Sequence, residues 1–67
     1  MKAYRLLTGA DDAAFCHKVT AALDKGWELW GDPACAFDAE AGTMRCAQAV
    51  VKEVPGWYDP GGRLGDL

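Results

Sequence analysis

The chain has 67 residues, so it forms at most one domain, and twelve alanines inflate its hydrophobic fraction of 51%. Its formal net charge of −3 argues against a nucleic-acid-binding protein, which would present a basic face. No apolar run approaches the roughly 18 residues of a membrane span, and no secretory leader is apparent. We therefore expect a soluble protein in the reducing cytoplasm.

The first element that we expect is a short strand over residues 2–7, followed by a turn at residues 8–10. Alternation along a strand places neighbouring side chains on opposite faces of the sheet. One face of this strand carries Tyr4 and Leu6, and the other carries Ala3, Arg5 and Leu7.

An amphipathic helix follows, and the rest of the chain is organised around it. Its apolar positions recur at the spacing of a core-facing stripe, with Cys16 at the margin: Phe15, Val19, Ala22 and Leu23. Two starts are open, a capping box from Thr8 to Asp11 or Asp11 itself as the cap. Gly26 suits the left-handed residue that ends many helices.

A second strand begins at Trp27-Glu28-Leu29-Trp30, where Trp27 and Leu29 are the better candidates for the helix side. Gly31-Asp32-Pro33 interrupts it before it resumes over residues 34–37. Because proline cannot donate to a strand ladder, this strand belongs at a sheet edge or carries a bulge.

A hairpin loop over residues 38–42 leads into the longest strand, residues 43–54. Small side chains allow a helix to approach closely, whereas Gln48 prefers water. We therefore expect the side with Ala47, Ala49 and Val51 to face the helix. The glycine- and proline-rich tail, residues 55–67, has no periodicity and is expected to be extended or disordered.

The order strand, helix, strand, strand indicates an α+β fold built from a β-α-β-β unit. A right-handed crossover between the first two strands leaves a gap that the third strand fills antiparallel. We expect a three-stranded sheet of order 1-3-2 with one helix on one face, a single domain over residues 1–54 and a tail over residues 55–67.

Three stretches of the sequence resemble a known family in their order and spacing: YRLLTGADDAAFCHKV, LDKGWELWGDP and CAQAVVKEV. The family consists of very short bacterial proteins and is catalogued as the domain of unknown function number seventeen-thirty-seven. The resemblance covers roughly residues 1–54. It implies a small α+β domain, and it implies no activity and no catalytic residue.

Four side chains have the chemistry of zinc ligands, namely Cys16, His17, Cys35 and Cys46, but they lack the CxxC or HxxxH spacing of a metal site. If the hairpin loop is the four residues 39–42, Cys35 and Cys46 stand directly opposite each other. Free cysteines usually behave as small buried hydrophobes. The odd number of cysteines makes a disulfide framework unexpected, so we predict three free thiols, no metal and no cofactor.

Aromatic residues are the remaining signal, because one helix covers only one face of a three-stranded sheet. If Trp27 lies under the helix, alternation places Trp30 on the open face, where a large aromatic typically marks an interface. The alternative is that the tail folds back and Trp57 or Tyr58 covers Trp30. The candidate interface comprises Trp30, Arg5, Leu7, Glu28, Trp57 and Tyr58. The favoured function is a self-associating, non-enzymatic interaction module, a homo-oligomer. The alternative is a small-ligand-binding protein or enzyme with a pocket between subunits that uses Trp30, Arg5 and Glu28.

Overall fold

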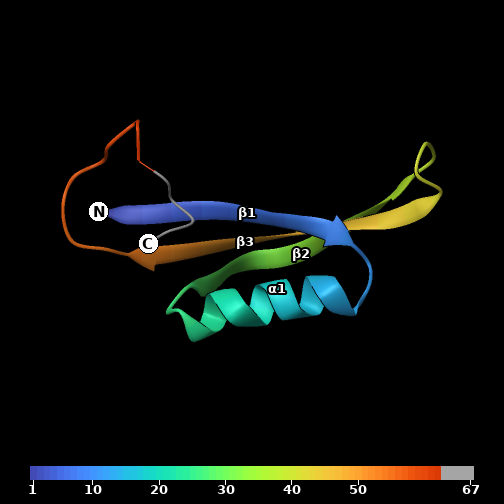
Figure 1. Ribbon diagram of the computed structural model, residues 1–67, viewed down its shortest axis with the longest axis horizontal. Helices are drawn as coiled ribbons and strands as arrows, with labels where there is room; N and C mark the ends of the chain where they lie inside the picture. The colour runs from blue at the N-terminus through green and yellow to red at the C-terminus, as the bar shows by residue number, and fades with distance from the viewer. Residues whose placement is uncertain (63–67) are drawn as a thin grey trace.

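The computed structural model describes residues 1–62 as an antiparallel sheet with one helix on one of its faces (Figure 1). The elements are β1 (Lys2–Ala10), α1 (Ala13–Asp24), β2 (Glu28–Asp38) and β3 (Thr43–Glu53). The strand order is β1-β3-β2, and β3 pairs antiparallel with both neighbours. The predicted α+β class and the 1-3-2 order are confirmed. No helix in the described part of the chain is long and apolar enough to cross a membrane.

Strand β1 is longer than the sequence suggested, because residues 8–10 continue the ladder instead of forming a turn. Gly9 pairs with Cys46 and Ala10 with Arg45. The absence of a side chain at Gly9 matters here, since an added Cβ would lie 3.2 Å from Cδ2 of Phe15. Glycine thus lets the first turn of α1 pack closely on the end of β1.

The cap of α1 is Asp12, whose side chain accepts a hydrogen bond of 3.1 Å from the main-chain nitrogen of Phe15. Both starts considered from the sequence were therefore wrong. Because β1 runs to Ala10, only Asp11 and Asp12 remain to join strand and helix, and the second of them occupies the cap. The predicted stop is confirmed, since Gly26 has a φ of 96°.

The core lies between α1 and the sheet, and Trp27 and Val50 are its most deeply buried large side chains. Its members are Ala3, Leu7, Ala22, Trp27, Val50 and Val54, with Met1, Phe15 and Val19 packed at the edge. The predicted helix face is confirmed except at Leu23, which is 40% exposed. The helix thus buries small Ala22 against the sheet, and Leu23 lies at its margin.

The prediction that the alanine side of β3 faces the helix is wrong. In an antiparallel pair, residues directly opposite each other share a face. Val50 pairs with Arg5 and Gln48 with Leu7, so both point to the helix side, where Val50 is fully buried. Gln48 is only 5% exposed, and its amide finds main-chain acceptors that replace water.

The β2–β3 hairpin turns at residues 39–42, the four-residue loop considered above. Oδ1 of Asp38 accepts hydrogen bonds of 3.1 Å and 3.2 Å from the main-chain nitrogens of Glu40 and Ala41. The nitrogen of Gly42 closes the turn with a 2.8 Å bond to the oxygen of Asp38. The hairpin is therefore held by its own main chain and one carboxylate.

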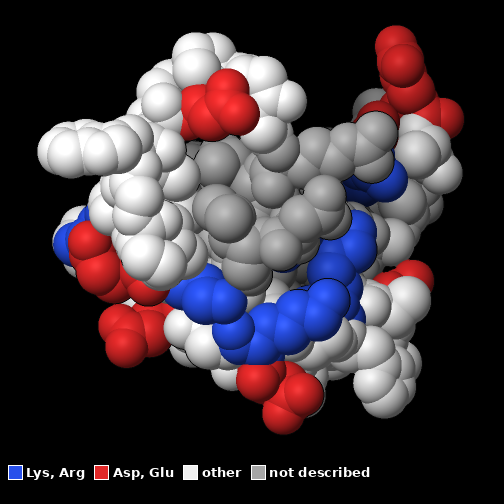
Figure 2. Space-filling model, turned by 60° about the vertical axis from the view of Figure 1, so that its left-hand side comes forward, with Lys and Arg blue, Asp and Glu red and all other residues white. Residues whose placement is uncertain are grey.

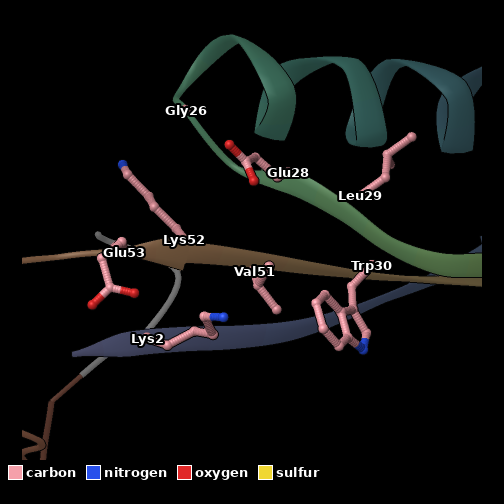
Figure 3. Close-up of a pocket in the computed structure, with 8 residues that line it drawn as sticks. All are labelled: Lys2, Gly26, Glu28, Leu29, Trp30, Val51, Lys52 and Glu53. Atoms are coloured by element: carbon pink, nitrogen blue, oxygen red, sulfur yellow. The ribbon is translucent and has the colours of Figure 1, made fainter.

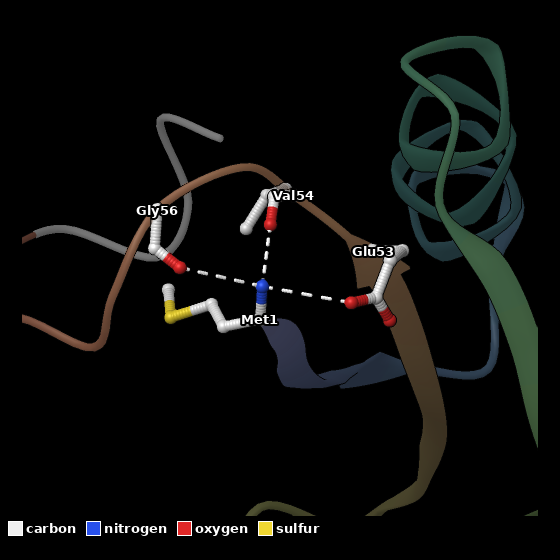
Figure 4. Close-up of polar contacts among 4 residues, drawn as sticks. All are labelled: Met1, Glu53, Val54 and Gly56. Carbon is white, nitrogen blue, oxygen red and sulfur yellow. Dashed lines mark hydrogen bonds and ion pairs between the residues drawn. The ribbon is translucent and has the colours of Figure 1, made fainter.

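The start of the tail is held by Met1 at the end of β1 (Figure 4). The amino group of Met1 donates to the oxygens of Val54 at 2.6 Å and Gly56 at 3.5 Å, and lies 3.5 Å from Oε1 of Glu53. Residues 54–62 contain no helix or strand. The expected tail extends to residue 67, and its last five residues lie outside the described part.

Candidate interaction surface

The sheet face opposite α1, called the open face here, carries no helix among the described residues. Its members follow from the register of the three strands. They are Lys2, Tyr4, Leu6, Thr8 and Ala10 from β1, Glu28, Trp30, Ala34, Ala36 and Asp38 from β2, and Thr43, Arg45, Ala47, Ala49, Val51 and Glu53 from β3.

Large exposed side chains of the open face lie on its outer strands. Tyr4, Leu6 and Trp30 are 52%, 54% and 59% exposed. Leu6 and Trp30 pair with the same central residue, Ala49, so the three form one row across the sheet with a small residue in the middle. Two apolar ridges therefore flank a low central strand.

The next row along the sheet contains only small side chains. Thr8 and Ala34 both pair with Ala47. A hollow of about 360 Å³ opens there, lined by Thr8, Ala34, Cys35, Ala36, Arg45, Cys46 and Ala47. We call it the alanine hollow. Most of its lining is apolar, and Arg45 supplies a charge at its end.

A second hollow, of about 550 Å³, lies at the end of the sheet where β1 begins (Figure 3). Its charged lining residues are Lys2, Glu28, Lys52 and Glu53, and the ring of Trp30 and Val51 complete its centre. We call it the charged hollow. Nζ of Lys2 lies 5.5 Å from the centre of the Trp30 ring, a cation–π contact. Basic side chains at this end of the molecule are flanked by acidic ones (Figure 2).

A bulge in β2 separates the two rows. Residues 31–33 are inserted between Trp30 and Ala34, with Gly31 at a φ of 71°. The bulge leans towards the helix, because Pro33 lines a groove there together with Phe15 and Val19. The proline in the sequence predicted that this strand lies at a sheet edge or carries a bulge, and it does both.

Two of the residues expected at the interface lie on the helix side instead. Leu7 is 4% exposed and belongs to the core, and the guanidinium of Arg5 lies 5.4 Å from the centre of the Trp27 ring. Their placement beside Trp30 was wrong, because odd-numbered residues of β1 face α1. Trp30 and Glu28 do lie together on the open face.

Sequence reasoning missed Tyr4 and Leu6 as members of this surface. Their signal was the alternation within β1, which already set them opposite Ala3 and Leu7. The tail residues Trp57 and Tyr58 are 94% and 68% exposed, so their side chains are accessible to a partner. Their part in an interface stays a prediction.

The cysteines differ from expectation, since Cys35 and Cys46 form a disulfide and Cys16 alone is free. Cys35 and Cys46 are directly opposite in the register, with Cα atoms 4.2 Å apart. The loop length already indicated this juxtaposition, but the odd cysteine count argued against a bond. The prediction of three free thiols is therefore wrong. Within residues 1–62, no three His, Cys, Asp or Glu side chains are grouped to hold a metal ion.

Comparison with known families matches residues 1–53 to the domain of unknown function DUF1737. The chain belongs to this family. The match covers all four elements described above, so the family resemblance found in the sequence is confirmed. Comparisons with curated proteins and with solved structures found no match. DUF1737 is a domain of unknown function, so membership in it assigns no activity, and the small α+β fold is known from the structure.

Proposed function

We propose that this DUF1737 protein is a non-enzymatic interaction module that self-associates through its open face. The observation that carries this proposal is the exposure of Trp30, Tyr4 and Leu6 on one face of a sheet whose other face is covered by α1. Contiguous exposed apolar groups of this kind mark interaction sites in small soluble proteins.

The free energy at stake supports a self-association of modest strength. Complete burial of a large apolar side chain stabilises by roughly 1.5–3 kcal/mol. The three side chains are each about half exposed, so covering them contributes roughly 1 kcal/mol apiece in each copy. Entropy lost on association offsets part of this gain. The three side chains thus supply roughly 6 kcal/mol per dimer before that offset, whereas a Kd of about 1 μM corresponds to about 8 kcal/mol, so the rest of the open face must contribute as well. We expect a dimer or higher oligomer at micromolar concentration.

Sedimentation velocity over a range of protein concentrations tests this proposal. The unmodified chain should sediment as a dimer or larger species, whereas Trp30→Asp should sediment as a monomer. Phe37→Asp is the matched control, because Phe37 is an equally exposed aromatic of β2, at 65%, but on the side facing α1. A stable monomer for the unmodified chain would rule out the proposal.

The charged hollow supports a second candidate function, the binding of a small ligand. Its lining includes two basic and two acidic residues, of which Lys2 lies 5.5 Å from the centre of the Trp30 ring, and this mixture of charges suits a small zwitterionic molecule. Arg5, expected to take part, lies on the other face. Free amino acids serve as probes, with the indole N–H signal of Trp30 followed by NMR. The absence of a shift at millimolar concentration would count against this candidate.

The cytoplasm remains our proposed location, and the disulfide supplies its test. Reductants there keep most protein thiols reduced. Rapid alkylation of intact cells should then trap Cys35 and Cys46 in the thiol form. If the pair is recovered fully oxidised from growing cells, the cytoplasmic assignment is wrong. Cys16, which is free and exposed, reports whether the reagent has reached the protein.

A further inference from the structure

The open face has a shape that fits a second copy of itself in one orientation. Its long central strand, β3, has Gln48 at its midpoint, between the large row of Leu6, Ala49 and Trp30 and the small row of Thr8, Ala47 and Ala34. Consider two sheets stacked with their open faces together, and a two-fold axis in the plane between them that runs perpendicular to the strands at the level of Gln48. Rotation about this axis brings the large row of one copy over the small row of the other. Each large row then faces the small row of the other copy.

We propose that two chains stack open face to open face about this axis, so that Trp30 of each copy enters the alanine hollow of the other. This geometry rests on the proposed self-association and specifies its partner and its contacts. Leu6 then lies over Thr8 of the second copy, and Trp30 over Ala34. Stacked sheets in proteins interdigitate in this way at a separation of about 10 Å.

The alternative two-fold axis, parallel to the strands, fits the surface poorly. It places each row over the same row of the second copy, so that Trp30 meets Leu6 and Ala34 meets Thr8. Large side chains then hold the sheets apart while the two alanine hollows face each other empty. Unfilled space of this kind forfeits dispersion contacts. The axis across the strands removes both defects.

Charge complementarity favours the same orientation. The row of Val51, with Glu28 beside it on β2, faces the row that contains Arg45 in the second copy. Arg45 thereby lies over Val51 of the second copy, with Glu28 in the same row and Glu53 in the next row along β3. Within one chain the Arg45 side chain is 58% exposed, with a 3.9 Å ion pair to Asp38. Each dimer gains this arrangement twice.

The size of the face agrees with a dimer of moderate affinity. Three strands about 4.8 Å apart, of 9, 11 and 11 residues at about 3.3 Å per residue, cover roughly 500 Å². Two copies together bury roughly 1,000 Å², the lower limit for a specific interface. Centring the axis on Gln48 overlaps the whole length of β3, whereas any other position along the strand buries less.

A size swap between positions 30 and 34 tests the geometry. Ala34→Trp places two indoles in the space of one, and Trp30→Ala leaves the alanine hollow empty, so each should raise the dimer Kd about tenfold or more. The double variant W30A/A34W restores one indole per hollow and should return the Kd to near the native value. Near-UV circular dichroism checks that each variant is folded.

A charge swap provides the second measurement. R45E should weaken the dimer, and E28R/R45E should recover it. If the native chain dimerises but neither double variant improves on its single variants, this stacking is wrong while self-association stands. If the native chain stays monomeric at every concentration, the proposed function itself fails.

Discussion

The side-chain amide of Gln48 donates a 3.4 Å hydrogen bond to the main-chain oxygen of Trp30, although the Trp30 ring lies on the other side of the sheet. The same nitrogen lies 3.4 Å from the oxygen of Gly31 and 2.8 Å from that of Ala49. Gln48 thus holds the start of the β2 bulge from the helix side. The bulge in turn sets Trp30 and Ala34 at their positions on the open face.

Replacing Gln48 with Leu should therefore destabilise the fold. The substitution leaves the oxygens of Trp30 and Gly31 without their amide donor in a partly buried site, which costs about 1–3 kcal/mol. Urea denaturation of the monomer measures this loss. Thr20→Ala, on the exposed side of α1, should change the free energy of unfolding by less than about 0.5 kcal/mol. Equal effects of the two substitutions would show that Gln48 does not support the bulge.

The disulfide between Cys35 and Cys46 should contribute to stability by restricting the unfolded chain. The two cysteines are 11 residues apart, and a loop of that length corresponds to about 3 kcal/mol in the chain-entropy model. Without reductant, a thiol reagent in denaturant should titrate one cysteine, and after reduction it should titrate three. Cys46→Ala should lower the urea midpoint, and Cys16→Ser should leave it nearly unchanged. Three reactive thiols before reduction would contradict the disulfide.

The cap of α1 offers a test between two adjacent aspartates. Asp12→Ala removes the acceptor for the Phe15 nitrogen and should cost about 1 kcal/mol. Asp11→Ala is the matched control, because within residues 1–62 Asp11 is engaged through its main-chain nitrogen, which donates to the oxygen of Met44 at 3.1 Å, and not through its carboxylate. Thermal denaturation of the two variants compares them directly. A larger loss from Asp11→Ala would place the cap where the sequence suggested.

Local patterns were enough to predict the strand order and most of the helix face. Phe15, Val19 and Ala22 recur at the spacing of one helix face, and in the fold this same face packs against the sheet. The orientation of β3 depended instead on a long-range fact, that the carbonyls of the bulge supply acceptors for a buried Gln48. The general preference of glutamine for water favoured an exposed Gln48, so the sequence analysis turned the wrong face of β3 towards the helix.

Only part of the candidate surface could be predicted, because the rest depends on pairing between strands that are distant in the sequence. Trp30 and Glu28 follow from alternation within one strand, whereas the neighbours across the sheet require the register between strands. Once that register is known, Tyr4 and Leu6 replace Arg5 and Leu7 beside Trp30. The disulfide was hard to predict for the same reason. Cys35 and Cys46 stand opposite each other only if the hairpin loop has four residues, and the sequence alone did not establish that length.

The two tryptophans of residues 27–30 should respond differently to substitution, because Trp27 is 2% exposed in the core and Trp30 is 59% exposed on the open face. Trp27→Ala removes a large buried side chain and should cost about 3–5 kcal/mol at every protein concentration. Trp30→Ala should lower the free energy of unfolding little in dilute solution, where the proposed dimer is dissociated. At higher concentration the loss in unfolding free energy relative to the native chain should grow, because the proposed association would stabilise the native fold by mass action.

Urea denaturation at two protein concentrations, about tenfold above and tenfold below the dimer Kd, separates these effects. If Trp27→Ala is too unstable to fold, Trp27→Phe provides a milder truncation at the same site. A Trp30→Ala deficit that does not change with concentration would mean that the Trp30 side chain stabilises its own chain and is not covered by a second copy. If the loss of unfolding free energy in Trp27→Ala instead grows with protein concentration, core packing and association are coupled. Removal of the Trp27 side chain would then also disturb the open face.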